Sequence, residues 1–188
     1  MPQAGHRDPA PDPLRIVQGF VNTNDVEAER ERLNSPAALH EWLIEQDLIA
    51  DDVELSAADL IRTVEIREAI RALLAAHNNL PADVQTATTQ LNAAAERADF
   101  VPKLDLSGGS RLEPRATGLD RALGQILAAI HAATANGTWE RIKACERESC
   151  RWAFYDHSKN RSGRWCQGAT CGTRERSRRA YQRRRAKT

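Results

Sequence analysis

Four cysteines are the residues of this chain whose type and spacing predict chemistry. They form two close pairs, Cys145-x4-Cys150 and Cys166-x4-Cys171, and fifteen residues separate the pairs. Two such pairs joined by a longer loop are the spacing of a zinc site with four thiolate ligands. Four thiolates complete the tetrahedral coordination of zinc and leave no position for water or a substrate. We therefore expect one structural Zn²⁺ ion, which stabilises a segment too short to bury a sufficient core of its own.

The surroundings of these cysteines favour metal binding over disulfide formation. His157 lies between the pairs as an alternative ligand, but four sulfurs already suffice. The N-terminus lacks the apolar segment of a signal peptide, and no apolar run approaches the roughly 20 residues that span a bilayer. Cysteines confined to one segment of a chain without an export signal favour reduced thiolates. The sequence therefore predicts a cytoplasmic protein that does not enter membranes.

Arginines dominate the segment behind the last cysteine. Glu175 is the only acidic residue between Gly172 and Arg185. Like charges at i,i+4 disfavour an isolated helix, and contact with phosphates would relieve this repulsion and release counterions. We expect nucleic acid to be contacted by the arginines of this segment and by the one before Cys166, namely Arg164, Arg174, Arg176, Arg178, Arg179, Arg183, Arg184 and Arg185.

Nothing in the sequence predicts catalysis. It has no paired carboxylates, Walker loop or GxSxG motif. Asp156, Ser158 and Asn160 lie between the cysteine pairs, and we expect their side chains to bond to backbone groups in turns. We expect Trp165, next to a ligand cysteine, to supply apolar mass to a small module rather than to stack on bases. The chain is therefore not expected to be an enzyme.

Capping residues and hydrophobic spacing place these motifs on a mostly helical chain. Ser35-Pro36 and the capping box that begins at Ser56 mark two helix starts, and Gly137 is typical of a helix end. The β-branched run from Leu14 to Thr23 is typical of a short strand. The expected elements are a strand over 14–23, a helix from 36 to 48–50 that buries Trp42, helices over 56–78, 82–98 and 118–136, a hairpin over 103–114, and a strand over 139–144.

The net charge of +1 conceals an uneven distribution. Residues 141–188 hold fifteen Lys and Arg against four Asp and Glu, a net charge of +11, whereas residues 1–140 hold twelve against twenty-two, a net charge of −10. An acidic part joined to a basic part indicates two modules with different partners, the basic one facing a polyanion. We expect a flexible tail over 1–13, a first domain over 14–137 and a second over 138–188.

The second module resembles the CGNR zinc-finger family. That family's pattern is C-x4-C, an aromatic residue, D-x-S-x-N, R-R-W-C, then C-G-N-R and a basic helix. This chain matches it at Cys145, Cys150, Phe154, Asp156, Ser158, Asn160, Arg164, Trp165, Cys166, Cys171, Gly172 and Arg174. It departs at Thr173, which replaces the signature asparagine, and at Gly163, where the pattern has its first arginine. Neither is a metal ligand, so the departures bear on turn geometry or one polar contact and not on zinc.

The first module resembles the ABATE domain that precedes this finger. The resemblance rests on Phe20-Val-Asn-Thr23, on Trp42-Leu43 and on Arg67-x-x-Ile70. It implies a treble-clef finger that binds DNA, in a stress-related transcription regulator whose N-terminal domain senses a ligand. Asn22 and Thr23 are candidates for lining the pocket of that small-molecule ligand, and a turn at a strand end explains them equally well.

The predicted fold is α+β and mainly helical: an ABATE-like domain with a small β element, then a treble-clef-like zinc finger with a basic C-terminal helix. The first expectation for function is a transcriptional regulator in which zinc positions an arginine-rich helix on double-stranded DNA. Two alternatives stay open. One is a protein-interaction module whose basic arm docks an acidic partner or its own acidic N-domain. The other is RNA binding, since phosphate contacts do not separate RNA from DNA.

Overall fold

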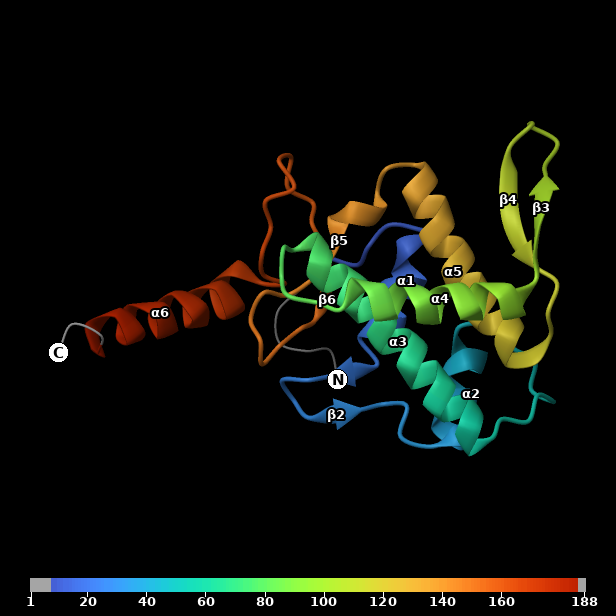
Figure 1. The fold of residues 1–188 in the computed structure, drawn as a ribbon, viewed down its shortest axis with the longest axis horizontal. Coiled ribbons are helices and arrows are strands. Elements are labelled where there is room, and N and C mark those ends of the chain that lie inside the picture. The colour runs from blue at the N-terminus through green and yellow to red at the C-terminus, as the bar shows by residue number, and fades with distance from the viewer. Residues whose placement is uncertain (1–7, 186–188) are drawn as a thin grey trace.

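The computed structural model of the protein describes residues 8–185. Helices α1 to α5 pack into one body, and α6 extends away from it (Figure 1). The helices are α1 (Leu14–Val21), α2 (Pro36–Glu45), α3 (Ala57–His77), α4 (Val84–Ala98), α5 (Gly118–Ala135) and α6 (Thr173–Arg185). None of the described helices is both long and apolar enough to cross a membrane.

The strands of the described residues form three antiparallel pairs, β1–β2, β3–β4 and β5–β6. They are β1 (Asn24–Asp25), β2 (Arg30–Glu31), β3 (Phe100–Leu104), β4 (Ser110–Pro114), β5 (Ile142–Ala144) and β6 (Ala153–Tyr155). Two short helical turns, η1 (Trp139–Arg141) and η2 (Gly168–Gly172), complete the fold. The fold is α+β and mainly helical, as predicted.

The segment predicted as a strand over 14–23 forms helix α1, so that prediction is wrong. Leu14, Val17, Phe20 and Val21 recur three and four residues apart, and all four are completely buried. This spacing places them on one face of a helix. Burial of that face in the core outweighs the strand preference of the β-branched residues, because local propensity is a weak determinant.

Side-chain caps begin α2 and α3 at the predicted positions. The Ser35 hydroxyl caps α2, and Ser56 and Asp59 form a capping box at the start of α3. Caps of this kind contribute about 0.5–2 kcal/mol to stability. Trp42 on α2 is buried as predicted, and its ring centroid lies 5.5 Å from that of Phe20. The end of α2 comes a few residues earlier than predicted.

Helix α4, the β3–β4 hairpin and helix α5 follow one another as predicted. Ala87, Leu91, Ala94 and Ala98 form the buried face of α4, whereas Val84 is 41% exposed because it lies at the first helical position. Gly108 in the hairpin turn and Gly137 after α5 have φ angles of 82° and 73°. Both values lie in the left-handed region that glycine enters without steric cost.

The β5–β6 hairpin belongs to the same core as the helices. The strand predicted over 139–144 begins as the turn η1, and only its last three residues pair with β6. Ile142, Ala144 and Ala153 are completely buried in one hydrophobic cluster with residues of α1, α3 and α5. His77 on α3 adds a polar contact, because its Nδ1 lies 2.9 Å from the Ile142 carbonyl. The metal-binding segment is therefore packed together with the residues before it.

Part of the expected flexible tail contacts this core. Residues 1–7 lie outside the described residues. Ala10 is completely buried, and its amide donates a hydrogen bond of 2.6 Å to the side-chain oxygen of Gln18 on α1. The chain is therefore held against α1 from Ala10 onward.

Candidate metal centre and nucleic-acid interface

The fold brings the side chains of all four cysteines together. Their sulfur atoms all lie within 4.8 Å of one another. The sulfur of Cys166 is 3.7 Å from that of Cys150 and 3.6 Å from that of Cys171. Sulfurs bound to one zinc ion at about 2.3 Å occupy the corners of a tetrahedron with edges of ~3.8 Å. The arrangement therefore fits the predicted site for a single Zn²⁺ ion.

The ionisation of the thiols also favours a bound cation. Hydrogen bonds from Cys150 and Cys166 lower the pKa of Cys145 below that of an ordinary thiol. The same contacts with Cys145 raise the pKa of Cys150 and the pKa of Cys166. One thiolate thus forms readily and opposes the ionisation of its neighbours, because like charges repel. A divalent cation among the sulfurs removes this opposition and lets all four thiols ionise.

The metal centre has a small hydrophobic cluster of its own. Trp152 and Trp165 pack against Cys145, Cys150 and Cys171. A Cβ atom at Gly172 would lie 3.2 Å from the Trp165 ring. The ring therefore covers the backbone directly after the last cysteine, and a larger residue than glycine would push it away. This position agrees with the structural role expected for Trp165.

Asp156 fixes the loop between the two cysteine pairs. Its carboxylate is buried and accepts hydrogen bonds from Lys143 Nζ at 2.8 Å, the Ser158 hydroxyl at 2.6 Å and the Gly163 amide at 2.7 Å. Burial alone would raise the pKa of Asp156, but the bonds from Lys143 and Ser158 outweigh it and lower the pKa to about 2. The turn role predicted for Asp156 and Ser158 is confirmed.

Both departures from the CGNR pattern have a local explanation. A Cβ atom at Gly163 would lie 2.7 Å from the carboxylate of Asp156, so glycine makes room for that buried group. Thr173 begins α6, and its hydroxyl donates to the Gly168 carbonyl at 3.4 Å and accepts from the Arg176 guanidinium at 3.0 Å. Thr173 thus links η2 to the first turn of the basic helix.

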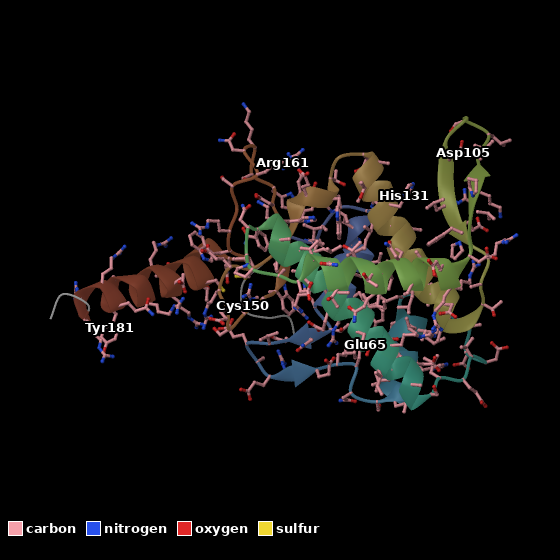
Figure 2. All side chains as sticks on the ribbon, in the orientation of Figure 1. Glu65, Asp105, His131, Cys150, Arg161 and Tyr181 are labelled. Atoms are coloured by element: carbon pink, nitrogen blue, oxygen red, sulfur yellow. The ribbon has the colours of Figure 1, made fainter. Side chains whose placement is uncertain are left out.

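The predicted nucleic-acid arginines lie in two places. Most lie on α6, whose side chains extend into solvent around Tyr181 (Figure 2). Arg174, Arg176, Arg178, Arg183, Arg184 and Arg185 are exposed, and the side chain of Arg179 is outside the described part of the structure. Arg164 lies in the loop before Cys166 and forms an ion pair with Glu146. The guanidinium groups of Arg164 and Arg176 lie 5.6 and 5.9 Å from the centroid of the Trp165 ring, so the zinc site brings these two together.

Asn22 and Thr23 lie where α1 meets β6 and α3. The Asn22 amide nitrogen donates to the Ala153 carbonyl at 2.9 Å, and its oxygen accepts from the Ala153 amide at 2.8 Å. The Thr23 hydroxyl donates to the Phe20 carbonyl at 2.8 Å and accepts from Arg67 at 3.2 Å. These bonds join parts of the chain to one another, and the ligand pocket expected at these residues stays a prediction.

Polar residues of α3 and its C-cap residue Asn78 hold the segment between Ala144 and Arg164, a role that was not predicted from the sequence. Arg71 donates to the Arg151 carbonyl at 3.0 Å. Asn78 donates to the carbonyls of Ala144 and Arg164, both at 2.8 Å. Arg67, one turn before Arg71, forms two bonds of 2.7 Å with the carboxylate of Glu31. A signal was present, since Arg67 and Arg71 interrupt the apolar face of α3 at a spacing of four residues.

A metal centre of four cysteines, built on a hairpin of the main core and followed by a basic helix, defines a zinc-finger protein with a helical N-terminal domain. Residues 14–137 match the ABATE family, described as "Putative stress-induced transcription regulator", and residues 141–184 match the CGNR zinc finger. The chain belongs to the ABATE family and carries a CGNR zinc finger with one structural zinc site. No curated protein matches the chain. Both matches fit a regulatory role.

Proposed function

We propose that this protein is a DNA-binding transcription regulator in which the zinc site orients α6 on the phosphate backbone of double-stranded DNA. The position of α6 carries the proposal. The helix begins two residues after Cys171, spans 13 residues, and leaves the body of the molecule (Figure 1). It has seven arginines and a single acid, Glu175. A helix with this charge gains from phosphate contact, which replaces repulsion between arginines by attraction and releases counterions.

The zinc ion has a structural role in this proposal. Four thiolates leave no open coordination position, so the protein acts by binding and not by catalysis. When bound, zinc holds the cysteine loops together and thereby sets the direction in which α6 leaves the body. The β5–β6 hairpin, the metal loops and the following helix support a treble-clef arrangement. The reduced thiols that zinc requires suit a cytoplasmic protein.

Binding to duplex DNA at increasing salt tests the proposal. The probes are a labelled DNA duplex, a single strand and an RNA duplex of the same sequence, followed by fluorescence anisotropy. Six to ten phosphate contacts predict a loss of about 10³–10⁵ in affinity for duplex DNA between 50 and 200 mM salt. An affinity for duplex DNA that does not change with salt would contradict the proposal. Tighter binding to the RNA duplex would favour the RNA alternative.

Two triple variants separate the effect of α6 from that of net charge. Arg183, Arg184 and Arg185 replaced by alanine remove three charges from α6. Arg97, Arg111 and Arg115 replaced by alanine remove three exposed charges near the β3–β4 hairpin, at the opposite end of the molecule from α6 (Figure 1). We expect the first variant to lose affinity and the second to keep it. Equal losses would show that only total charge matters.

The same measurements address the protein-partner alternative. The basic helix contacts the acidic N-terminal part through an ion pair of Arg174 with Glu27. The rest of α6 extends away from the body (Figure 1). A zinc-loaded, folded protein that binds neither DNA nor RNA would favour an acidic protein as the partner of α6.

A further inference from the structure

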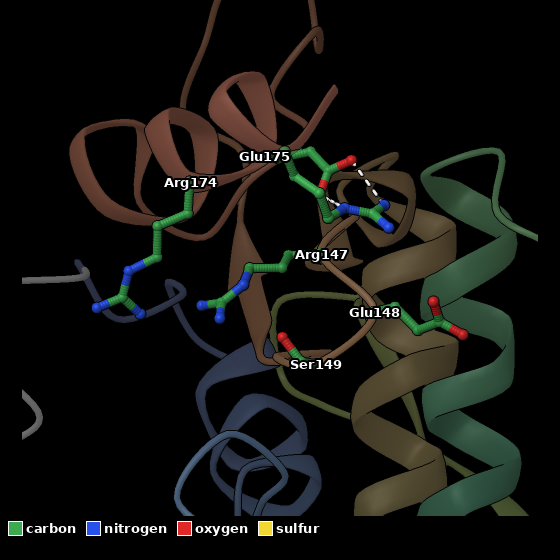
Figure 3. A pocket seen from close by; sticks show the side chains of 6 residues that line it. Arg147, Glu148, Ser149, Arg174 and Glu175 are labelled. Atoms are coloured by element: carbon green, nitrogen blue, oxygen red, sulfur yellow. Dashed lines mark hydrogen bonds and ion pairs between the residues drawn. The ribbon is translucent and has the colours of Figure 1, made fainter. Parts of the chain in front are cut away.

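A cavity of about 550 Å³ lies between the loop that follows β5 and the first turns of α6. The loop contributes Arg147, Glu148 and Ser149, and the helix contributes Arg174, Glu175 and Arg178. In Figure 3 the side chains of Arg147 and Arg174 extend toward the same side, and Glu148 points away from both. Glu175 and Arg178 pair with each other at 2.9 Å. Arg147 and Arg174 thus form the positive side of the cavity.

A carboxylate from a distant part of the chain already bridges these two arginines. Glu27, in the turn between β1 and β2, accepts hydrogen bonds from both guanidinium groups through the same oxygen, Oε1, and its distance from Arg147 is 2.6 Å. Burial raises the pKa of Glu27, but the hydrogen bonds and charges of Arg147 and Arg174 outweigh that effect and lower it. The two arginines are therefore positioned to hold an oxyanion between them.

The two arginines differ in how firmly they are held. The side chain of Arg147 is 19% exposed and that of Arg174 is 56% exposed. Arg147 lies two residues after the zinc ligand Cys145, and its guanidinium donates a hydrogen bond of 2.6 Å to Glu27. Arg147 is thus fixed beside the metal centre, and Arg174 is the accessible member of the pair. An incoming anion meets one guanidinium already in place and a second that adjusts to it.

We propose that Arg147 and Arg174, with Ser149 at the cavity wall, form a site for one backbone phosphate of nucleic acid, and that Glu27 occupies this site until the phosphate displaces it. The inference rests on the proposed function and adds a specific site and an internal competitor to it. A phosphodiester has two free oxygens, so each guanidinium gains its own acceptor in place of a shared one. Charge-assisted bonds of this kind are the strongest that arginine forms.

The β1–β2 turn is able to release Glu27 without disturbing the core. Each of its strands has two residues, so few ladder bonds hold it. Its base is fixed separately, because the buried Arg67 binds the carboxylate of Glu31 through two bonds of 2.7 Å. Phosphate binding at the finger therefore displaces the Glu27 carboxylate while the ABATE domain stays folded. By linkage, a ligand that holds Glu27 in place weakens phosphate binding by some factor, and phosphate weakens the binding of that ligand by the same factor.

The substitutions Glu27→Gln and Glu29→Gln test the competitor. Both remove one negative charge from the same turn, and both residues are exposed, but only Glu27 contacts Arg147 and Arg174. We expect Glu27→Gln to bind duplex DNA about threefold to tenfold more tightly than the wild type, in line with the loss of two partly exposed ion pairs. We expect Glu29→Gln to stay within twofold of the wild type. Equal affinities of the two variants for duplex DNA would contradict the proposal that Glu27 competes with phosphate.

The substitution Arg147→Gln tests the phosphate site itself. Loss of one phosphate contact makes the slope of log affinity against log salt less steep by about 1. It also weakens binding to all DNA sequences alike. Zinc content and melting temperature are measured in parallel, and Arg174→Gln, which removes the accessible arginine of the same site, replaces the variant if zinc is lost. If Arg147→Gln had the same slope as the wild type, the phosphate site would be overturned. The proposed function would still stand as long as the wild type bound DNA in a salt-dependent way. A wild type that binds no nucleic acid would overturn both.

Discussion

The side-chain amide of Asn22 and the backbone of Ala153 form two hydrogen bonds across 131 positions of the sequence. The amide thus pairs with β6 as a neighbouring strand would. Through this contact a residue that ends α1 supports the hairpin on which the metal loops are built. The two parts of the chain that match different families are therefore joined by directed polar bonds as well as by a shared apolar core.

We expect Asn22→Ala to destabilise the whole protein. Ala153 is completely buried, so its amide loses its partner, whereas its carbonyl keeps a bond of 3.3 Å from Gln18. A buried polar group without a partner costs about 1–3 kcal/mol. Chemical denaturation measures the loss in free energy of unfolding. The control is Asn34→Ala at an exposed position, where a change within about 0.5 kcal/mol is expected. A similar change in both variants would contradict the prediction.

The buried pair of Lys143 and Asp156 leads to a prediction about pH. The pKa of Asp156 falls from 3.8 to about 2 on folding, so the unfolded chain binds more protons between these values. The ionised Asp156 carboxylate therefore stabilises the fold fully above pH ~4, and this stabilisation is lost as the pH falls through the folded pKa. It amounts to about 2 kcal/mol. We expect Asp156→Asn to lower stability at pH 7 by at least this amount, because Lys143 is left buried without a counter-charge.

Denaturation at several pH values checks this prediction. The difference between the wild type and Asp156→Asn should shrink as the pH drops from 4 toward 2. Because acid also protonates the zinc ligands in both proteins, the difference is the informative quantity. The double variant Lys143→Met with Asp156→Asn should recover part of the loss if the unpaired lysine is its cause. An equal stability of wild type and single variant at pH 7 would rule out the proposed role of the pair.

Removal of zinc should affect more than the finger. Cys166→Ser is expected to lower the zinc content from one ion per chain to none and to abolish DNA binding, since the direction of α6 depends on the metal loops. The melting temperature of the entire chain should fall as well, because the β5–β6 hairpin lies in the common core. Metal analysis, calorimetry and a binding assay measure the three effects. A variant that binds DNA without metal would refute the structural role of the site.

An isolated finger is not expected to fold. A fragment of residues 138–188 would expose Ile142, Ala144 and Ala153, which the full chain buries completely. It would also lose the bonds from Asn78 to Ala144 and Arg164. Even with zinc added, its amide NMR spectrum should show the narrow dispersion of an unfolded chain. A well-dispersed spectrum would mean that four thiolates suffice to fold the segment.

The sequence predicts the features that depend on near neighbours. Ser35 and Ser56 cap helices at the expected residues, because a cap requires only groups within three positions. The cysteine spacing likewise identifies the metal site, because each pair is a local loop. The strand predicted over 14–23 is wrong because its β-branched residues favour a strand locally, whereas burial against α5 and α3 decides for a helix.

Contacts between distant residues could not be predicted from one sequence. Glu27 is one of many acids in an acidic segment, and nothing near it indicates that it contacts Arg147 and Arg174. The sequence does not indicate the pairing of Asn22 with Ala153 either, since an asparagine after a helix is usually a local cap. The burial of Ile142 is a further example, because it depends on contacts with α3 and not on its own sequence neighbours.

The shared core around Ile142, Ala144 and Ala153 has a consequence for the inheritance of this architecture. If recombination placed the finger behind an unrelated domain, Ile142, Ala144 and Ala153 would be exposed to water. The carbonyls of Ala144 and Arg164 would also lose their hydrogen bonds from Asn78. If it removed the finger, α1 and α3 would lose the residues that cover them. The ABATE domain and the finger are therefore expected to be transferred between genes only together, unlike zinc fingers that fold as independent domains.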